Sequence, residues 1–120
     1  MHQAEEWKRR SKDLALRVFK LCRALPKSDE ARIISKQLLR CSTSVAANYR
    51  AVCRSRSRSE FVARMGVVVE EADETAFWLE FLVDAGIVSP RRMEGLLHEA
   101  NELVAIFAAS QHTARSAVNQ

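Results

Sequence analysis

The chain has 120 residues, enough for one domain, and its 3 Gly and 2 Pro leave long stretches without helix-breaking residues, which predicts an all-α protein. Its three cysteines show no C-x-x-C spacing, and no apolar run is long enough to span a membrane. These features argue against a disulfide framework, a structural zinc site and a membrane helix, and predict a cytoplasmic location. The net charge of +4 is divided unevenly, because residues 1–60 carry +9 and residues 61–120 carry −5.

The first half of the chain contains two predicted helices, over residues 5–24 and 29–54. In the first, apolar residues recur every three or four positions, as one face of a helix requires: Trp7, Leu14, Val18, Leu21 and Leu25. Pro26 ends that helix, and Ser28 is placed to cap the second with its side-chain oxygen. The inner face of the second helix is expected to hold Ile34, Leu38, Cys41, Val45, Asn48 and Val52.

The second half contains two more predicted helices, over residues 58–85 and 90–115. Ser57 and Glu60 have the spacing of a capping box, Gly86 offers left-handed backbone after the third helix, and Ser89 and Pro90 suit the start of the fourth. The predicted inner faces are Phe61, Met65, Val68, Ala72, Thr75, Leu79 and Leu82, then Met93, Leu97, Ala100, Val104 and Phe107. Because the connections are short, we predict an antiparallel up-down-up-down four-helix bundle that forms a single domain over residues 1–120.

The third predicted helix also carries aromatic residues on its outer side. Phe77 and Phe81 lie about 200° round the helix from Thr75 and Leu79, and Trp78 widens this apolar zone. A helix that is apolar on most sides is normally buried on most sides, so we expect Phe77, Trp78 and Phe81 to lie in a subunit interface. The alternative is that loops or the N-terminal segment cover them within one chain.

No motif of a known active site is present. The densest group of carboxylates comprises Glu70, Glu71, Asp73 and Glu74. This group lacks the Glu-x-x-His pairs of di-metal bundles, so a solvated or salt-bridged face is the favoured interpretation. Cys22 and Cys41 have no histidine in their helices to act as a base and are expected to fill the core. We therefore predict no enzymatic activity, no cofactor and no metal ion.

Basic residues gather on one side of the second predicted helix and in the segment that follows it. They are Arg32, Lys36, Arg40, Arg50, Arg54, Arg56 and Arg58. Such a ridge suits a phosphate backbone, because each neutralised phosphate releases counterions whatever the base sequence. The alternative is that these side chains pair with acids of the third and fourth helices, within one chain or between subunits.

Asn48 is a polar residue on the predicted inner face, between Val45 and Val52. A buried amide without a hydrogen-bond partner costs about 1–3 kcal/mol. We therefore predict a structural role for Asn48, with Glu71 or helix backbone as its partner in preference to a ligand.

Several motifs in the chain resemble those of one known family. They are QLLRCSTSVAANYR at 37–50, SEF at 59–61, EEADET at 70–75 and WLE at 78–80. This set is similar to the bacterial four-helix-bundle family named for proteins encoded in intervening sequences of 23S ribosomal RNA genes. The resemblance implies a bundle that assembles into a cyclic homo-oligomer, commonly a pentamer, without enzymatic activity. Similar bundles include the accessory protein of diversity-generating retroelements, a basic ring that binds nucleic acid and a reverse transcriptase.

Residue patterns and resemblance together predict a non-catalytic, ring-forming protein that binds RNA or DNA through the basic side of the second helix. The alternative is an oligomeric scaffold for a protein partner, in which the arginines form pairs between subunits. A third hypothesis, metal-assisted chemistry at Glu70, Glu71 and Glu74, predicts metal in the purified protein. No contact with a membrane is expected.

Overall fold

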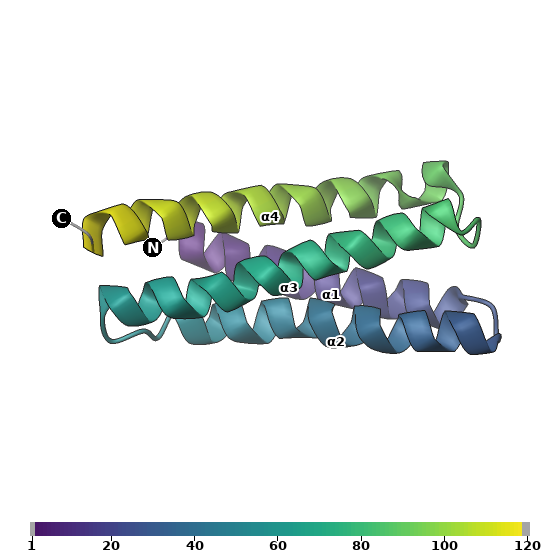
Figure 1. The fold of residues 1–120 in the computed structure, drawn as a ribbon, viewed down its shortest axis with the longest axis horizontal. Coiled ribbons are helices and arrows are strands. Elements are labelled where there is room, and N and C mark those ends of the chain that lie inside the picture. Colours follow the sequence, from purple (N-terminus) through teal and green to yellow (C-terminus); the bar gives the residue numbers. More distant parts are fainter. Residues whose placement is uncertain (1, 119–120) are drawn as a thin grey trace.

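A computed structural model describes residues 2–118, which form four helices joined by short connections (Figure 1). The helices are α1 (His2–Ala24), α2 (Asp29–Val52), α3 (Arg58–Asp84) and α4 (Pro90–Val118). They run antiparallel in chain order, in a bundle of 50 × 23 × 20 Å, and the two chain ends lie at the same end of it. The predicted fold class is confirmed. Compared with the predicted bounds, α1 begins before residue 5, α2 ends before residue 54 and α4 continues past residue 115.

Local signals at the helix ends act as the sequence predicted. Ser28 accepts a hydrogen bond from the backbone N–H of Ala31 at 3.2 Å, and Ser57 accepts one from that of Glu60 at 3.1 Å. Gly86 has a φ of 74°, the left-handed backbone that a residue without Cβ adopts at little cost. These signals set where α2 and α3 begin and where the chain turns toward α4.

The buried side chains of all four helices form one core. In α3 the predicted inner face is confirmed except that Phe61 is half-buried. In α4 the prediction is wrong at two positions, because Leu96 and Leu103 are buried where Leu97 and Val104 were expected. Leu97 and Val104 are half-buried. Neighbouring positions on a helix are only about 100° apart, so both pairs belong to one broad apolar arc, and packing against α3 decides its centre.

The order of the helices around the bundle places α1 and α3 on one diagonal. Each helix packs extensively on the next in the chain, whereas α1 and α4 meet over a short stretch. Within residues 2–118, the backbone of α1 does not come close to that of α3, nor the backbone of α2 to that of α4. The outer sides of α1 and α3 therefore face away from each other, on opposite sides of the bundle.

Candidate interaction surfaces

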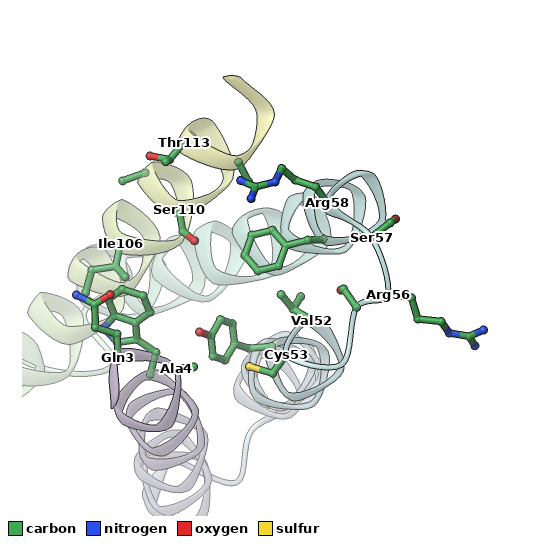
Figure 2. A pocket seen from close by; sticks show the side chains of 16 residues that line it. Gln3, Ala4, Val52, Cys53, Arg56, Ser57, Arg58, Ile106, Ser110 and Thr113 are labelled. Atoms are coloured by element: carbon green, nitrogen blue, oxygen red, sulfur yellow. The ribbon is translucent and has the colours of Figure 1, made fainter. Parts of the chain in front are cut away.

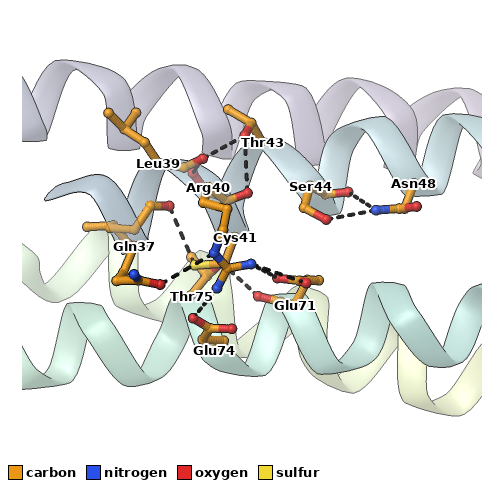
Figure 3. Close-up of polar contacts among 12 residues, drawn as sticks. Gln37, Leu39, Arg40, Cys41, Thr43, Ser44, Asn48, Glu71, Glu74 and Thr75 are labelled. Atoms are coloured by element: carbon orange, nitrogen blue, oxygen red, sulfur yellow. Dashed lines mark hydrogen bonds and ion pairs between the residues drawn. The ribbon is translucent and has the colours of Figure 1, made fainter. Parts of the chain in front are cut away.

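A charged network joins the middle of α2 to the middle of α3 (Figure 3). Arg40 pairs with Glu71 at 3.2 Å and also with Glu74, and the indole N–H of Trp78 donates to Glu74 at 3.1 Å. The hydrogen bond from Arg40 lowers the pKa of Glu74, and the pKa of Arg40 is raised in return. Arg40 therefore pairs with acids of the third helix, as the alternative interpretation of the basic residues predicted.

Buried polar groups extend this network into the core. The Thr75 hydroxyl lies 3.3 Å from the Cys41 sulfur and donates to the Glu71 carbonyl at 2.9 Å. Gln37 accepts a hydrogen bond from the Arg40 Nε at 3.4 Å. Residues from the motifs at 37–50, 70–75 and 78–80 thus meet at one place on the α2–α3 contact.

Asn48 is half-buried, so the prediction that it occupies an inner position is wrong. The buried residue of this turn is Tyr49, whose ring stacks on Phe107 of α4 with centroids 4.9 Å apart. The Asn48 amide donates to the Ser44 carbonyl at 2.9 Å and to the Ser44 hydroxyl at 2.7 Å (Figure 3). Of the two predicted partners, helix backbone is therefore confirmed and Glu71 is not the partner. Because adjacent residues are about 100° apart, the apolar stripe can pass through either position, and the larger aromatic ring fills the space facing α4.

Phe77, Trp78 and Phe81 form an aromatic patch on the outer side of α3. Phe77 is 51% exposed and Phe81 is 42% exposed, while Trp78 is half-buried. The Trp78 ring centroid lies 5.0 Å from that of Phe77 and 5.7 Å from that of Phe81. The outward orientation of the two phenylalanines is confirmed, and residues 2–118 leave them uncovered within one chain.

A second exposed apolar group lies on α1 and was not singled out from the sequence. It is the α1 pair, Leu16 and Phe19, which are 50% and 45% exposed. Since α1 and α3 are on one diagonal, the α1 pair and the aromatic patch belong to helices that lie across the bundle from each other.

The seven basic residues singled out from the sequence are all exposed, but they differ in their partners. Arg32 lies 3.8 Å from Asp29 and donates to the Lys27 carbonyl at 3.4 Å, and Arg40 belongs to the charged network. Within the described residues, no carboxylate forms an ion pair with the remaining five, Lys36, Arg50, Arg54, Arg56 and Arg58. The last four lie within nine residues around the α2–α3 connection, and we call them the arginine cluster.

Glu60 is the acid nearest to the arginine cluster in the chain. It pairs with Arg64 at 2.8 Å, and its second oxygen accepts the backbone N–H of Arg56 at 3.4 Å. Arg64 also donates to the Ala51 carbonyl at 3.0 Å. This acid is thus occupied in capping α3 and in holding Arg64, and the guanidinium groups of the cluster keep their charge uncompensated.

A pocket of about 910 Å³ opens at the same end of the bundle, and we call it the end pocket (Figure 2). It lies between the first turns of α1, the end of α2 with its connection to α3, the first turn of α3 and the last turns of α4. Its aromatic lining comes from Trp7, Tyr49 and Phe61. In Figure 2, Arg58 extends from α3 toward α4, whereas Arg56 points away from the pocket.

The carboxylates and cysteines discussed above as possible catalytic groups do not form a metal site or an activated nucleophile in the described part of the chain. Among residues 2–118, no group of three or more His, Cys, Asp or Glu side chains is placed to hold a metal ion. Burial raises the pKa of the Cys22 and Cys41 thiols, which disfavours the nucleophilic thiolate. Over the same residues, no helix has both the length and the apolar character needed to cross a membrane.

Comparison with known proteins supplies the family. The sequence profile described as 23S rRNA-intervening sequence protein matches residues 3–109, nearly the whole chain. The chain belongs to this family. A solved structure from Bacteroides thetaiotaomicron, described as a protein with unknown function from the S23 ribosomal protein family, is 27% identical to this chain. The match covers 91% of this chain and 97% of the other, with a TM-score of 0.83. No curated protein is found to match.

Two further features of the structure were not predicted from the sequence. Arg10 of α1 donates to Glu99 of α4 at 2.7 and 2.9 Å, and the two residues lie 89 positions apart. The end pocket is assembled from the ends of all four helices. One pattern in the sequence indicates this pocket. Trp7 and Phe61 lie at the ends of the apolar faces of their helices, where side chains of a bundle remain partly exposed.

Proposed function

We propose that this protein is a non-catalytic, ring-forming module that binds the phosphate backbone of nucleic acid through the arginine cluster. The observation that carries the proposal is that Arg50, Arg54, Arg56 and Arg58 are exposed together and form no ion pair within the described residues. Guanidinium groups bind phosphate in a bidentate manner, and an anionic backbone can neutralise positive charges that have no carboxylate partner. Three free cysteines support a cytoplasmic location for this activity.

The basic surface that we propose for binding is smaller than the one that the sequence predicted. Arg40 is neutralised by two acids and Arg32 faces Asp29, so neither supplies its full charge to a ligand. Lys36 remains available but lies on the stretch of α2 between them. We therefore assign the main phosphate contacts to the end of α2 and the start of α3.

The test replaces two arginines of the cluster and measures binding to a short fluorescein-labelled RNA over a series of salt concentrations. Arg50→Gln with Arg54→Gln should weaken binding and lower the slope of log affinity against log salt by about 1.4, or about 0.7 for each phosphate of a single strand that is no longer neutralised. The matched control is Arg91→Gln with Arg92→Gln, two exposed arginines at the opposite end of the bundle. Equal losses of affinity in both variants, or binding that does not depend on salt, would overturn the proposal.

A second candidate function is an oligomeric scaffold that presents its surface to a protein partner and binds no nucleic acid. It is favoured by the aromatic patch and the α1 pair, since exposed apolar groups on helices across the bundle from each other suit head-to-tail contacts between copies. Head-to-tail contacts close into a ring when the rotation between subunits allows it. A ring that binds neither RNA nor DNA at low salt would exclude the first function and favour this one.

A further inference from the structure

We infer that the end pocket receives unpaired bases of a single-stranded nucleic acid whose backbone lies on the arginine cluster. The inference rests on the proposed function and names the class of nucleic acid that the same end of the bundle selects. It comes from the position of the pocket, which lies among aromatic side chains and beside uncompensated positive charge.

The shape and lining of the end pocket suit planar aromatic groups. Its volume of about 910 Å³ is within the usual range for pockets that hold small molecules, about 300–1,000 Å³. Trp7 and Phe61 are half-buried, so their rings border the opening, while buried Tyr49 lies deeper and is held by its stacking on Phe107. Base stacking on such rings tolerates any sequence, because every base has a π-face.

The charge around the opening suits a phosphate backbone. Among the described residues that line the end pocket there is no Asp or Glu, and Arg58 supplies positive charge. Arg58 reaches from α3 toward Ser110 and Thr113 of α4 (Figure 2), which places its guanidinium beside the opening. A backbone that contacts the arginine cluster therefore passes the opening, with its bases free to turn inward.

The polar lining offers hydrogen bonds without a fixed pattern. Gln3, Ser110 and Thr113 carry groups that both donate and accept, so different base edges can be satisfied. Ser55 also belongs to the lining, and its buried hydroxyl has no hydrogen-bond partner within residues 2–118. Bases in a duplex are stacked and paired and cannot enter such a pocket, which predicts a preference for single strands.

The experiment uses Trp7 as a reporter inside the end pocket. The chain has two tryptophans, so Trp78→Phe leaves Trp7 as the sole source of indole fluorescence. A short RNA is titrated into the full chain as a single strand and as a duplex with its complement. The single strand should quench Trp7 and bind more tightly, whereas the duplex should bind through the arginines with little quenching.

Paired substitutions at one position separate stacking from folding. Phe61→Leu keeps an apolar side chain but removes the ring, and should weaken single-strand binding by about 5- to 150-fold while leaving duplex binding unchanged. Phe61→Tyr keeps the ring and should retain the affinity. The quenching of Trp7 is measured with Phe61 unchanged, so it tests whether bases enter the pocket even if Phe61→Leu disturbs the fold.

The possible outcomes separate this inference from the proposed function. If single strand and duplex bind equally and Trp7 emission does not change, the pocket is not a base site, although the arginine cluster still binds backbone. If neither form binds in a salt-dependent manner, both proposals fail. If raising the protein concentration without RNA quenches Trp7 and also prevents any further change on addition of single-stranded RNA, a second copy of the chain occupies the pocket and the inference is overturned.

Discussion

Arg10 is the residue that ties α1 to α4, the two neighbouring helices that meet over the shortest stretch. Its guanidinium donates twice to Glu99 and also pairs with Glu102, and only 18% of its side chain is exposed. Hydrogen bonds to charged partners contribute about 1.5–3 kcal/mol, so Arg10→Met should lower the free energy of unfolding by about 1–3 kcal/mol. Urea denaturation with an unchanged m-value measures this decrease. The exposed neighbour Arg9 provides the control, and an equal decrease in Arg9→Met would contradict the assignment.

The same ion pair makes stability depend on pH. The hydrogen bond from Arg10 holds the pKa of Glu99 below its usual value of about 4.3, against the opposing effect of burial. As pH falls, Glu99 therefore takes up a proton in the unfolded chain before it does so in the folded chain. The contribution of this pair to stability is complete above the pKa of Glu99 in the unfolded chain and is lost as pH falls through its pKa in the folded chain. Glu99→Gln should therefore lose less stability than the wild type between about pH 5 and pH 3. Glu94→Gln, an exposed acid of α4, should follow the wild-type curve.

At the scale of the helices, two glycines should respond to alanine in opposite directions. Gly86 has a positive φ in the α3–α4 connection, so Gly86→Ala should cost about 1–2 kcal/mol. Gly95 lies inside α4, where a Cβ would meet the Arg17 guanidinium at an ordinary 3.6 Å, so Gly95→Ala should gain up to about 1 kcal/mol. Thermal unfolding should lower the Tm of the first variant and raise that of the second. A Tm for Gly86→Ala that does not fall would show that the backbone at Gly86 is not under this constraint, and a lower Tm for Gly95→Ala would contradict the expected gain in α4.

The helices could be predicted from the sequence because their signals are local. Ser28, Ser57 and Gly86 act on backbone groups within a few residues, and those groups need no tertiary contact to be recognised. The rotation of each helix depends on its neighbours, which is why Asn48 was assigned the buried position of Tyr49. The end pocket depends on where four helices end in space, and periodicity along one chain carries no information about that.

For the whole molecule, two groups of basic residues in the first half of the chain differ in whether their positive charge is compensated. In the middle of the bundle it is compensated across helices, by Glu71 and Glu74 for Arg40 and by Glu99 and Glu102 for Arg10. At the end near the α2–α3 connection, the arginine cluster keeps its charge. Ion pairs explain the charges in the middle of the bundle, and the proposed nucleic-acid contact concerns only the arginines at its end.

The arrangement of exposed apolar groups leads to a prediction about assembly. If the aromatic patch of one copy meets the α1 pair of the next, Phe77→Ser with Phe81→Ser and Leu16→Ser with Phe19→Ser should each give monomers by multi-angle light scattering. Ile33→Ser, which changes an exposed residue of α2, should leave the assembled mass unchanged.

Mixing the two double variants tests the direction of that contact. Each retains the surface that the other lacks, so an equimolar mixture should form a heterodimer and stop, because only one intact contact remains between them. A contact of like with like predicts a different result: one variant would assemble by itself, and the mixture would form no heterodimer. For the wild type, one mass that stays constant with concentration indicates a closed ring, whereas a mass that grows indicates an open filament. The cyclic homo-oligomer requires both the heterodimer and the constant mass.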